Sequence, residues 1–282
     1  MGFIRGFLGG RFGRLIFLTG MAATTGMAWG SITAYEVLSG SEFGVIDLGT
    51  GAFTYIGNSG EQLAGLGVYG GTLYGGLAYI DSKGGGNTFY QVNVATGALT
   101  AVGNGSALLN DFGSTLSGLY GIDTDGNLYS VDPSTGVDTL VGATGLGAPS
   151  STVGLSTNSN TLYYSFGSNL YTLNTSTGAA TLVGALGASQ DGAMVYEGGS
   201  LYAGINSPLS IDTVNPSTGA ATSGPAVAGT VEAFWGLAPD SVSVSSTPEP
   251  ATFGLLVAAG AMLALRGRVG RVSRKSPGED AE

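Results

Sequence analysis

The segment Tyr129–Gly142 reads YSVDPSTGVDTLVG, and it returns with small changes at four other places in the chain. One glycine of each segment follows a Thr, and the spacings between these glycines are 46, 39, 42 and 41 residues. A near-constant period of this length predicts a repeat architecture in which each unit is one small group of strands. The other segments are VIDLGTGAFTYIG (45–57), YQVNVATGALTAVG (90–103), YTLNTSTGAATLVG (171–184) and DTVNPSTGAATSG (212–224), and the five glycines are Gly51, Gly97, Gly136, Gly178 and Gly219.

Each segment has the pattern of a β-hairpin. Residues 128–132 alternate in the manner of a strand, and residues 139–141 supply the returning strand. Between them, Pro133 sets a turn φ and Gly136 is free to take a positive φ. A short polar side chain opens the turn in the repeats and predicts a hydrogen bond to the turn backbone rather than a catalytic role; these residues are Asp132, Asn93, Asn174 and Asn215.

A further strand precedes most of the hairpins. The candidates are Leu119–Asp123, Val153–Thr157, Ala193–Glu197 and Trp235–Ala238. Turn residues follow the first three of them, at 125–127, 158–160 and 198–199. Each repeat therefore holds at least three antiparallel strands, with room for a fourth in the connecting segment.

The predicted fold class is all-β, as a β-propeller of about five blades with repeats of about 40 residues. The hairpin at 45–57 lacks a clear preceding strand, whereas residues 231–238 form such a strand with no hairpin after it. The C-terminal side is therefore expected to supply the missing strand of the first blade and close the ring. A parallel β-helix is the alternative, but its rungs are shorter. The repeat also resembles those of bacterial propellers of the pyrroloquinoline-quinone-enzyme and Kelch-like kind, without a cofactor motif, so no cofactor is expected.

Charge is distributed unevenly along the chain. Residues 29–247 contain 15 acidic residues and a single cation, Lys83. Such a body repels nucleic acid and anionic lipid. The chain has neither Cys nor His, which removes disulfides, thiolate metal sites and the commonest general base.

The N-terminus has the three parts of a secretory signal peptide. Residues 1–14 carry Arg5, Arg11 and Arg14 without an acid, and an apolar stretch follows over 15–28. Ala28 closes a small-residue cleavage site, and Ala34 is a second candidate. A first helix packed on the body is the alternative, which the many glycines of this stretch disfavour. We expect export through the Sec translocon after cleavage of residues 1–28.

The C-terminus combines a short motif, an apolar run and a cluster of cations. Pro248, Glu249 and Pro250 precede an uncharged run over 251–265, which is short for a membrane-spanning helix. Cations after such a run hold that end in the cytoplasm. The basic cluster consists of Arg266, Arg268, Arg271, Arg274 and Lys275.

This arrangement resembles the PEP-CTERM sorting signal of Gram-negative bacteria. The resemblance implies recognition and processing by an exosortase, transient anchoring in the inner membrane, and release to the cell surface or matrix. It covers roughly residues 247–275, and the chain departs from the pattern in an extra acidic tail over 276–282. An ordinary tail anchor with a chance PEP tripeptide is the alternative.

The remaining motifs favour structural roles. Residues 123–127 (DTDGN) look like the opening of a calcium loop, but the twelfth position is Ser134 where an EF-hand needs Glu. A turn explains them better, and no metal site is predicted. Residues 65–67 and 84–86 are Gly-rich but lack the helix and the Lys of a phosphate loop. Seven tyrosines mostly occupy repeat positions and are expected to pack within blades: Tyr69, Tyr74, Tyr79, Tyr120, Tyr129, Tyr163 and Tyr171.

The expected organisation is a signal peptide (1–28), a propeller (29–241), a linker with the PEP motif (242–250), a transmembrane segment (251–265) and a basic cytoplasmic tail (266–282). The expected function is non-enzymatic, with no catalytic residue assigned: a surface or matrix protein that binds exopolysaccharide, another matrix protein or bridging divalent cations. A glycan lyase or hydrolase with carboxylates from different blades in the central funnel is the alternative. A structural spacer without a ligand is a third.

Overall fold

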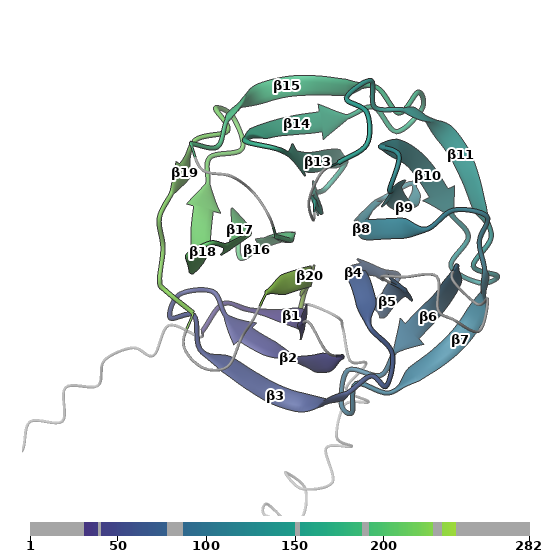
Figure 1. Cartoon of the computed structure of the whole chain (residues 1–282), viewed down its shortest axis with the longest axis horizontal. Helices are drawn as coiled ribbons and strands as arrows, with labels where there is room; N and C mark the ends of the chain where they lie inside the picture. The colour runs from purple at the N-terminus through teal and green to yellow at the C-terminus, as the bar shows by residue number, and fades with distance from the viewer. Residues whose placement is uncertain are drawn as a thin grey trace, which may run out of the picture. The chain divides into compact units, whose positions relative to one another are not determined.

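Twenty strands form five antiparallel sheets of four strands each in the computed structural model, which describes residues 31–38, 41–77, 87–149, 153–187, 192–227 and 233–240. The chain divides into two compact units, Met1–Ser31 and Ile32–Glu282, and the second contains every described strand. The sheets follow one another around a common axis as the blades of a propeller (Figure 1). The prediction of an all-β, five-bladed propeller is confirmed.

Blade one combines both ends of the described chain, in the order β20-β1-β2-β3. Its strands are β20 (Phe234–Pro239), β1 (Thr33–Leu38), β2 (Glu42–Asp47) and β3 (Phe53–Asn58). Blade two consists of β4 (Leu63–Tyr69), β5 (Thr72–Leu77), β6 (Thr88–Val92) and β7 (Leu99–Asn104).

The other three blades each use four consecutive strands. Blade three consists of β8 (Leu109–Thr115), β9 (Gly118–Asp123), β10 (Asn127–Val131) and β11 (Asp138–Ala143). Blade four consists of β12 (Gly154–Asn158), β13 (Thr161–Phe166), β14 (Asn169–Leu173) and β15 (Ala180–Ala185). Blade five consists of β16 (Met194–Glu197), β17 (Ser200–Asn206), β18 (Leu209–Val214) and β19 (Ala221–Thr222).

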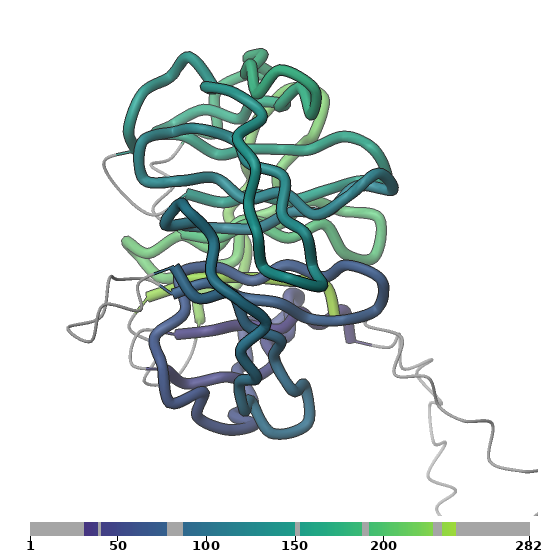
Figure 2. The backbone as a smooth tube through the Cα atoms, turned by 90° about the vertical axis from the view of Figure 1, so that its right-hand side faces the viewer, coloured from purple at the N-terminus to yellow at the C-terminus, as the bar shows by residue number. Residues whose placement is uncertain are grey.

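The C-terminal strand closes the ring, as predicted. β20 pairs antiparallel with β1, from Ala34 opposite Pro239 to Leu38 opposite Phe234. Figure 2 shows this last strand, in yellow-green, among the purple strands from the start of the chain. The pairing leaves no blade with a missing inner strand.

Two details of the strand prediction are wrong. The first hairpin does have a preceding strand, β1, and what the C-terminus adds is the inner, fourth strand of the blade. The predicted preceding strands also do not correspond from blade to blade. Residues 119–123 form a second strand, β9, whereas 153–157 and 193–197 lie in the inner strands β12 and β16. The inner strand β8 reads LNDFGST. Because it contains polar residues and a glycine, the sequence pattern did not predict a strand there.

Apolar side chains fill the junctions between blades. Within the described residues each junction has its own buried cluster; for example, Tyr35 and Val37 of blade one contact Leu63 and Leu66 of blade two. Successive residues of a strand therefore face opposite neighbours, and both faces of the inner strands are apolar. The core of this fold is thus a ring of five junctions rather than one central core.

A second contact repeats at the rim, where the turn of one blade meets the outer strand of the blade before it. The turn glycines Gly97, Gly136, Gly178 and Gly219 have φ between 72° and 79°, which favours glycine. Each turn places the carbonyl of its preceding Thr against a strand glycine of the previous blade. A Cβ at Gly184 would lie 2.0 Å from the carbonyl oxygen of Thr218. The same distance is 2.0 Å for Gly57 and Thr96, 1.9 Å for Gly103 and Thr135, and 2.1 Å for Gly142 and Thr177.

We call this contact the glycine latch: a Thr-Gly turn of one blade against the Val-Gly or Ile-Gly end of the preceding outer strand. Four of the five junctions have it. At the fifth, between blades five and one, Gly51 instead meets the carbonyl of Ala226, because β19 is only two residues long and no Val-Gly end follows it. The repeat is therefore broken where the ring closes.

Substitution of Gly184 by Ala tests the latch. The added methyl group has no room beside the Thr218 carbonyl, so we expect the free energy of unfolding in urea to fall by about 1–3 kcal/mol. Gly118→Ala is the matched control, because its Cβ would meet only Tyr120, at 3.9 Å. Equal stability of the two variants would contradict the latch.

Candidate functional site

The five inner strands together line an axial cavity. Its volume is about 80 Å³, and residues of β4, β8, β12, β16 and β20 all contribute to it. The lining is Leu66, Gly67, Val68, Phe112, Gly113, Ser114, Leu155, Ser156, Thr157, Ser159, Met194, Leu237 and Pro239. All five blades therefore meet at this hollow.

The lining is apolar with a polar margin and no carboxylate. Ser114 donates from Oγ to the carbonyl of Val68 at 2.5 Å and so joins blades two and three. Ser156 is buried, and the Oγ1 of Thr157 is buried without a hydrogen-bond partner. A cavity of this size holds several water molecules but is well below the roughly 300–1,000 Å³ of ordinary ligand pockets.

A narrow ring of small residues lies one position before the cavity on each inner strand. These positions hold Gly65, Asp111, Gly154, Ala193 and Gly236. The strands approach closely there: a Cβ at Gly236 would lie 2.7 Å from the amide nitrogen of Leu66, and one at Gly65 would lie 2.4 Å from Asp111. The ring therefore has room for a single larger side chain, and Asp111 is that side chain.

Asp111 is fully buried and interacts with backbone amides of the inner strands. Its Oδ2 accepts a hydrogen bond of 2.6 Å from the amide of Leu155 in blade four. Burial raises the pKa of this carboxyl well above its usual range, while the amides of Leu155, Phe112 and Leu66 oppose the rise. Oδ1 has no hydrogen-bond partner. Inner strands leave one edge unpaired, and Asp111 satisfies the Leu155 amide on that edge of blade four.

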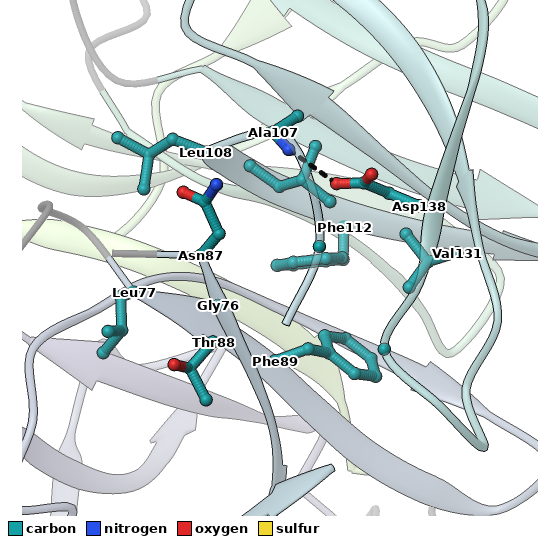
Figure 3. Close-up of a pocket in the computed structure, with 13 residues that line it drawn as sticks. Gly76, Leu77, Asn87, Thr88, Phe89, Ala107, Leu108, Phe112, Val131 and Asp138 are labelled. Atoms are coloured by element: carbon teal, nitrogen blue, oxygen red, sulfur yellow. Dashed lines mark hydrogen bonds between the residues drawn. The ribbon is translucent and has the colours of Figure 1, made fainter. Parts of the chain in front are cut away.

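A second, smaller hollow lies between blades two and three (Figure 3). Its volume is about 10 Å³, which is the room of one water molecule. Asp138 lies at its side, and its carboxylate accepts hydrogen bonds from the Ser106 amide at 2.8 Å, the Ser106 hydroxyl at 2.5 Å and the Ala107 amide at 2.8 Å. The hydrogen bonds of Asp138 thus hold the β7–β8 connection against blade three. Residues equivalent to Asp138 in the other repeats are Phe53, Leu99, Ala180 and Ala221.

The polar residues of the repeat turns bond to the turn backbone. Asn93, Asn174 and Asn215 accept from the amide two residues later at 3.0, 2.8 and 2.9 Å. Asp132 accepts from the amide and the hydroxyl of Ser134, and these bonds lower its pKa. These side chains hold the turns that form the glycine latch.

The DTDGN segment forms a closed turn. Asp123 Oδ1 accepts from the amides of Asp125 at 2.9 Å and Asn127 at 2.7 Å, and Oδ2 accepts from the Asn127 side chain at 2.9 Å. The carboxylate is therefore engaged within its own hairpin. Among the described residues, no group of three or more acidic side chains has the geometry of a metal site.

The predicted tyrosines that are described pack within and between blades. Tyr120 and Tyr163 are buried, and the rings of Tyr74 and Phe89 stack with centroids 5.0 Å apart. Tyr69, Tyr129 and Tyr171 are partly buried against the junction clusters. Tyr79 lies outside the described residues, as does Lys83.

The predicted sorting residues also lie outside the described part of the chain. These are Pro248, Glu249, Pro250, Arg266, Arg268, Arg271, Arg274 and Lys275. No helix within the described ranges is long and apolar enough to cross a membrane.

The five predicted turn glycines all have a positive φ, from 71° to 79°.

The sequence reasoning missed three acidic residues, Glu36, Asp111 and Asp138. Each stands at a repeat position where the other blades carry an uncharged residue, and that contrast is the signal that could have found them. For Asp111 the contrast appears only when the inner strands are aligned, and the sequence pattern did not predict the inner strand β8.

Comparisons with known proteins concern the fold. No family model matches the sequence, and no curated protein matches it either. The structure is similar to a chain in the crystal structure of a nidogen/laminin complex, with a TM-score of 0.51 and 9% identity over 74% of this chain and 98% of that chain. At this identity the likeness supports the propeller architecture alone.

Two further similarities are weaker. A structural genomics protein of unknown function from Bacteroides thetaiotaomicron VPI-5482 matches with a TM-score of 0.43 and 13% identity, over 68% of this chain and 49% of that chain. The computationally designed Ika4 protein matches with a TM-score of 0.33 and 12% identity, over 54% of this chain and 90% of that chain.

Proposed function

We propose that the protein is exported, held briefly in the inner membrane by its C-terminal tail, processed by an exosortase, and used as a non-enzymatic binding or structural component of the cell surface or matrix. The sorting part of the proposal rests on the order of the PEP motif, the apolar run and the basic cluster. The binding part of the proposal rests on the acidic charge of the propeller.

The limits of the propeller support the sorting scheme. All described strands lie between Thr33 and Pro239, so removal of residues 1–28 and of the chain from the PEP motif onward leaves the ring complete. Cleavage at Ala34 would instead remove the start of β1, where Ala34 pairs with Pro239. The site at Ala28 is therefore preferred.

The charge of the propeller suits an extracellular role without nucleic acid or anionic lipid. Its described residues include twelve acids, seven of them at least partly exposed, and neither Lys nor Arg. A surface of one sign binds neutral polymers or partners with complementary charge, or it binds other anions through bridging cations. The acids are Glu36, Glu42, Asp47, Glu61, Asp111, Asp123, Asp125, Asp132, Asp138, Glu197, Asp212 and Asp240.

The positions of the carboxylates favour binding over catalysis. Glycoside hydrolysis needs two carboxylates about 5–9.5 Å apart beside a sugar-sized pocket. No described acid lines the axial cavity, and Asp111 lies below it without access for a sugar. Asp123, Asp132 and Asp138 are engaged with backbone amides. Exopolysaccharide or another matrix protein is therefore the proposed partner, on the outer surface of the ring.

The sorting proposal predicts the mature C-terminus. Mass spectrometry of protein recovered from the cell surface or medium should find it ending near the PEP motif, without Arg266–Glu282. A variant with Pro248, Glu249 and Pro250 all changed to Ala should keep its tail and stay in the membrane fraction. An intact tail in the surface form of the unaltered protein would contradict exosortase processing.

The binding proposal predicts retention of polymer without cleavage. Mature protein incubated with exopolysaccharide purified from the producing bacterium should sediment with it, and the polymer's size distribution should not change. A fall in polymer size with new reducing or unsaturated ends would favour the lyase or hydrolase alternative. Absence of co-sedimentation would contradict the binding proposal and favour the structural spacer without a ligand.

A further inference from the structure

The junction between blades one and five differs from the other four. Blade one is completed by the pairing of β1 with β20, strands about 200 residues apart, and its junction with blade five lacks the glycine latch. Within blade one, the amide of Leu48 donates to the carbonyl of Ile32 at 2.8 Å, and Thr33 donates from its hydroxyl to Asp240. Across the junction, Asn206 of blade five accepts from the amide of Phe234 at 2.8 Å and donates to the carbonyl of Phe234 at 3.4 Å, and an apolar cluster fills the rest.

Glu36 lies in the middle of β1, in the blade that closes the ring. It is paired with Leu237 of β20 on one side and with Gly44 of β2 on the other. Ala34 belongs to the cluster with Ala193, Val195 and Leu237, whereas Tyr35 and Val37 face blade two. Because side chains alternate along a strand, Glu36 faces blade five together with Ala34.

The carboxyl of Glu36 has no compensating group. Its exposure is 0%, and neither oxygen has a hydrogen-bond partner. Its pKa is raised well above its usual range, and burial alone is the cause. The described part of the chain has no Lys or Arg to pair with it. The ionisable residues on the elements packed against β1, and on β1 itself, are Tyr35, Glu42, Asp47, Tyr69, Tyr196, Glu197 and, directly after β20, Asp240.

The other blades avoid an acid at this position. In each blade the inner-strand residue equivalent to Leu237 lines the axial cavity, and its partner on the second strand is equivalent to Glu36. These partners are Gly75 opposite Leu66, Gly121 opposite Phe112, Tyr164 opposite Leu155 and Ala203 opposite Met194. The blade built from both ends of the described chain is thus the one with a carboxyl there.

We propose that blade one is a proton-dependent closure of the propeller. The ring is held shut while the Glu36 carboxyl is neutral, and the β1–β20 pairing opens more readily once Glu36 is ionised. An ionised, unpaired carboxylate in an apolar junction is costly, and the cost is relieved when β20 separates and water enters. The proposal is independent of the route of export and of the ligand.

The direction of the pH dependence follows from the higher pKa in the folded state. Folding then takes up a proton at Glu36, so this contribution to stability is complete below the unfolded pKa of about 4.3 and is lost as pH rises through the raised folded value. The closure is therefore tightest in mild acid and weakens toward neutral and alkaline pH.

Hydrogen exchange of the mature protein at pH 5 and pH 8 tests the proposal, after correction for the intrinsic pH dependence of amide exchange. Peptides of β1 and β20 should lose protection about tenfold or more at pH 8, whereas peptides of β13 and β14 in blade four should change much less. In Glu36→Gln the loss at β1 and β20 should disappear, and the urea midpoint at pH 8 should exceed that of the unaltered protein.

Glu42→Gln is the matched control, because it removes the same charge from a half-buried position on the neighbouring strand and should keep the pH dependence. Glu36→Ala, which introduces the residue found at the equivalent Ala203, provides the same test if the Gln variant folds poorly. Persistence of the pH dependence in Glu36 variants would overturn the proposal. Equal loss of protection in blades one and four would overturn it as well.

Discussion

The Thr-Gly turn of four of the five repeats packs its backbone directly on a glycine of the preceding blade, and this contact sets how closely neighbouring blades approach. At Gly184 the space left for a side chain is smaller than a methyl group, because the Thr218 carbonyl lies there. The same geometry recurs at four junctions, so one short segment fixes both its own hairpin and its neighbour's position. Apolar clusters then fill the space that remains between the blades.

The axis and the closing junction are the two places where this regular scheme gives way to individual residues. At the axis, a ring of Gly and Ala admits one carboxyl, Asp111, which accepts from Leu155 of the next blade. At the closure, strand pairing between the two ends of the described chain completes blade one, the junction with blade five lacks the latch, and a second carboxyl, Glu36, is buried beside it. Burial raises the pKa values of both acids. Burying these two carboxyls costs free energy, and the repeat pattern alone does not require it.

The sequence was sufficient to predict the parts of the structure that repeat. Gly136 after Ser-Thr predicts a turn, the near-constant period predicts the blades, and an unpaired strand at the end predicts closure from the C-terminal side. The sequence was insufficient to predict residues whose burial depends on the assembled ring and not on the local sequence pattern. β8 carries Asn110 and Asp111 on a strand that becomes buried only when all five blades meet. The burial of Glu36 depends on Leu237, 201 positions later, and no local pattern reveals it.

The central claim is that the turn glycine and the strand glycine at one junction form a single contact. A double-mutant cycle in urea between Gly184→Ala and Gly219→Ala, both at the junction of blades four and five, measures this directly. The account predicts that the second substitution costs less once the first is present, with a coupling of at least about 0.5 kcal/mol. The pair Gly184→Ala and Gly97→Ala, at different junctions, should be additive within about 0.3–0.5 kcal/mol. Additivity in both pairs would contradict the latch as the element that sets the spacing of the blades.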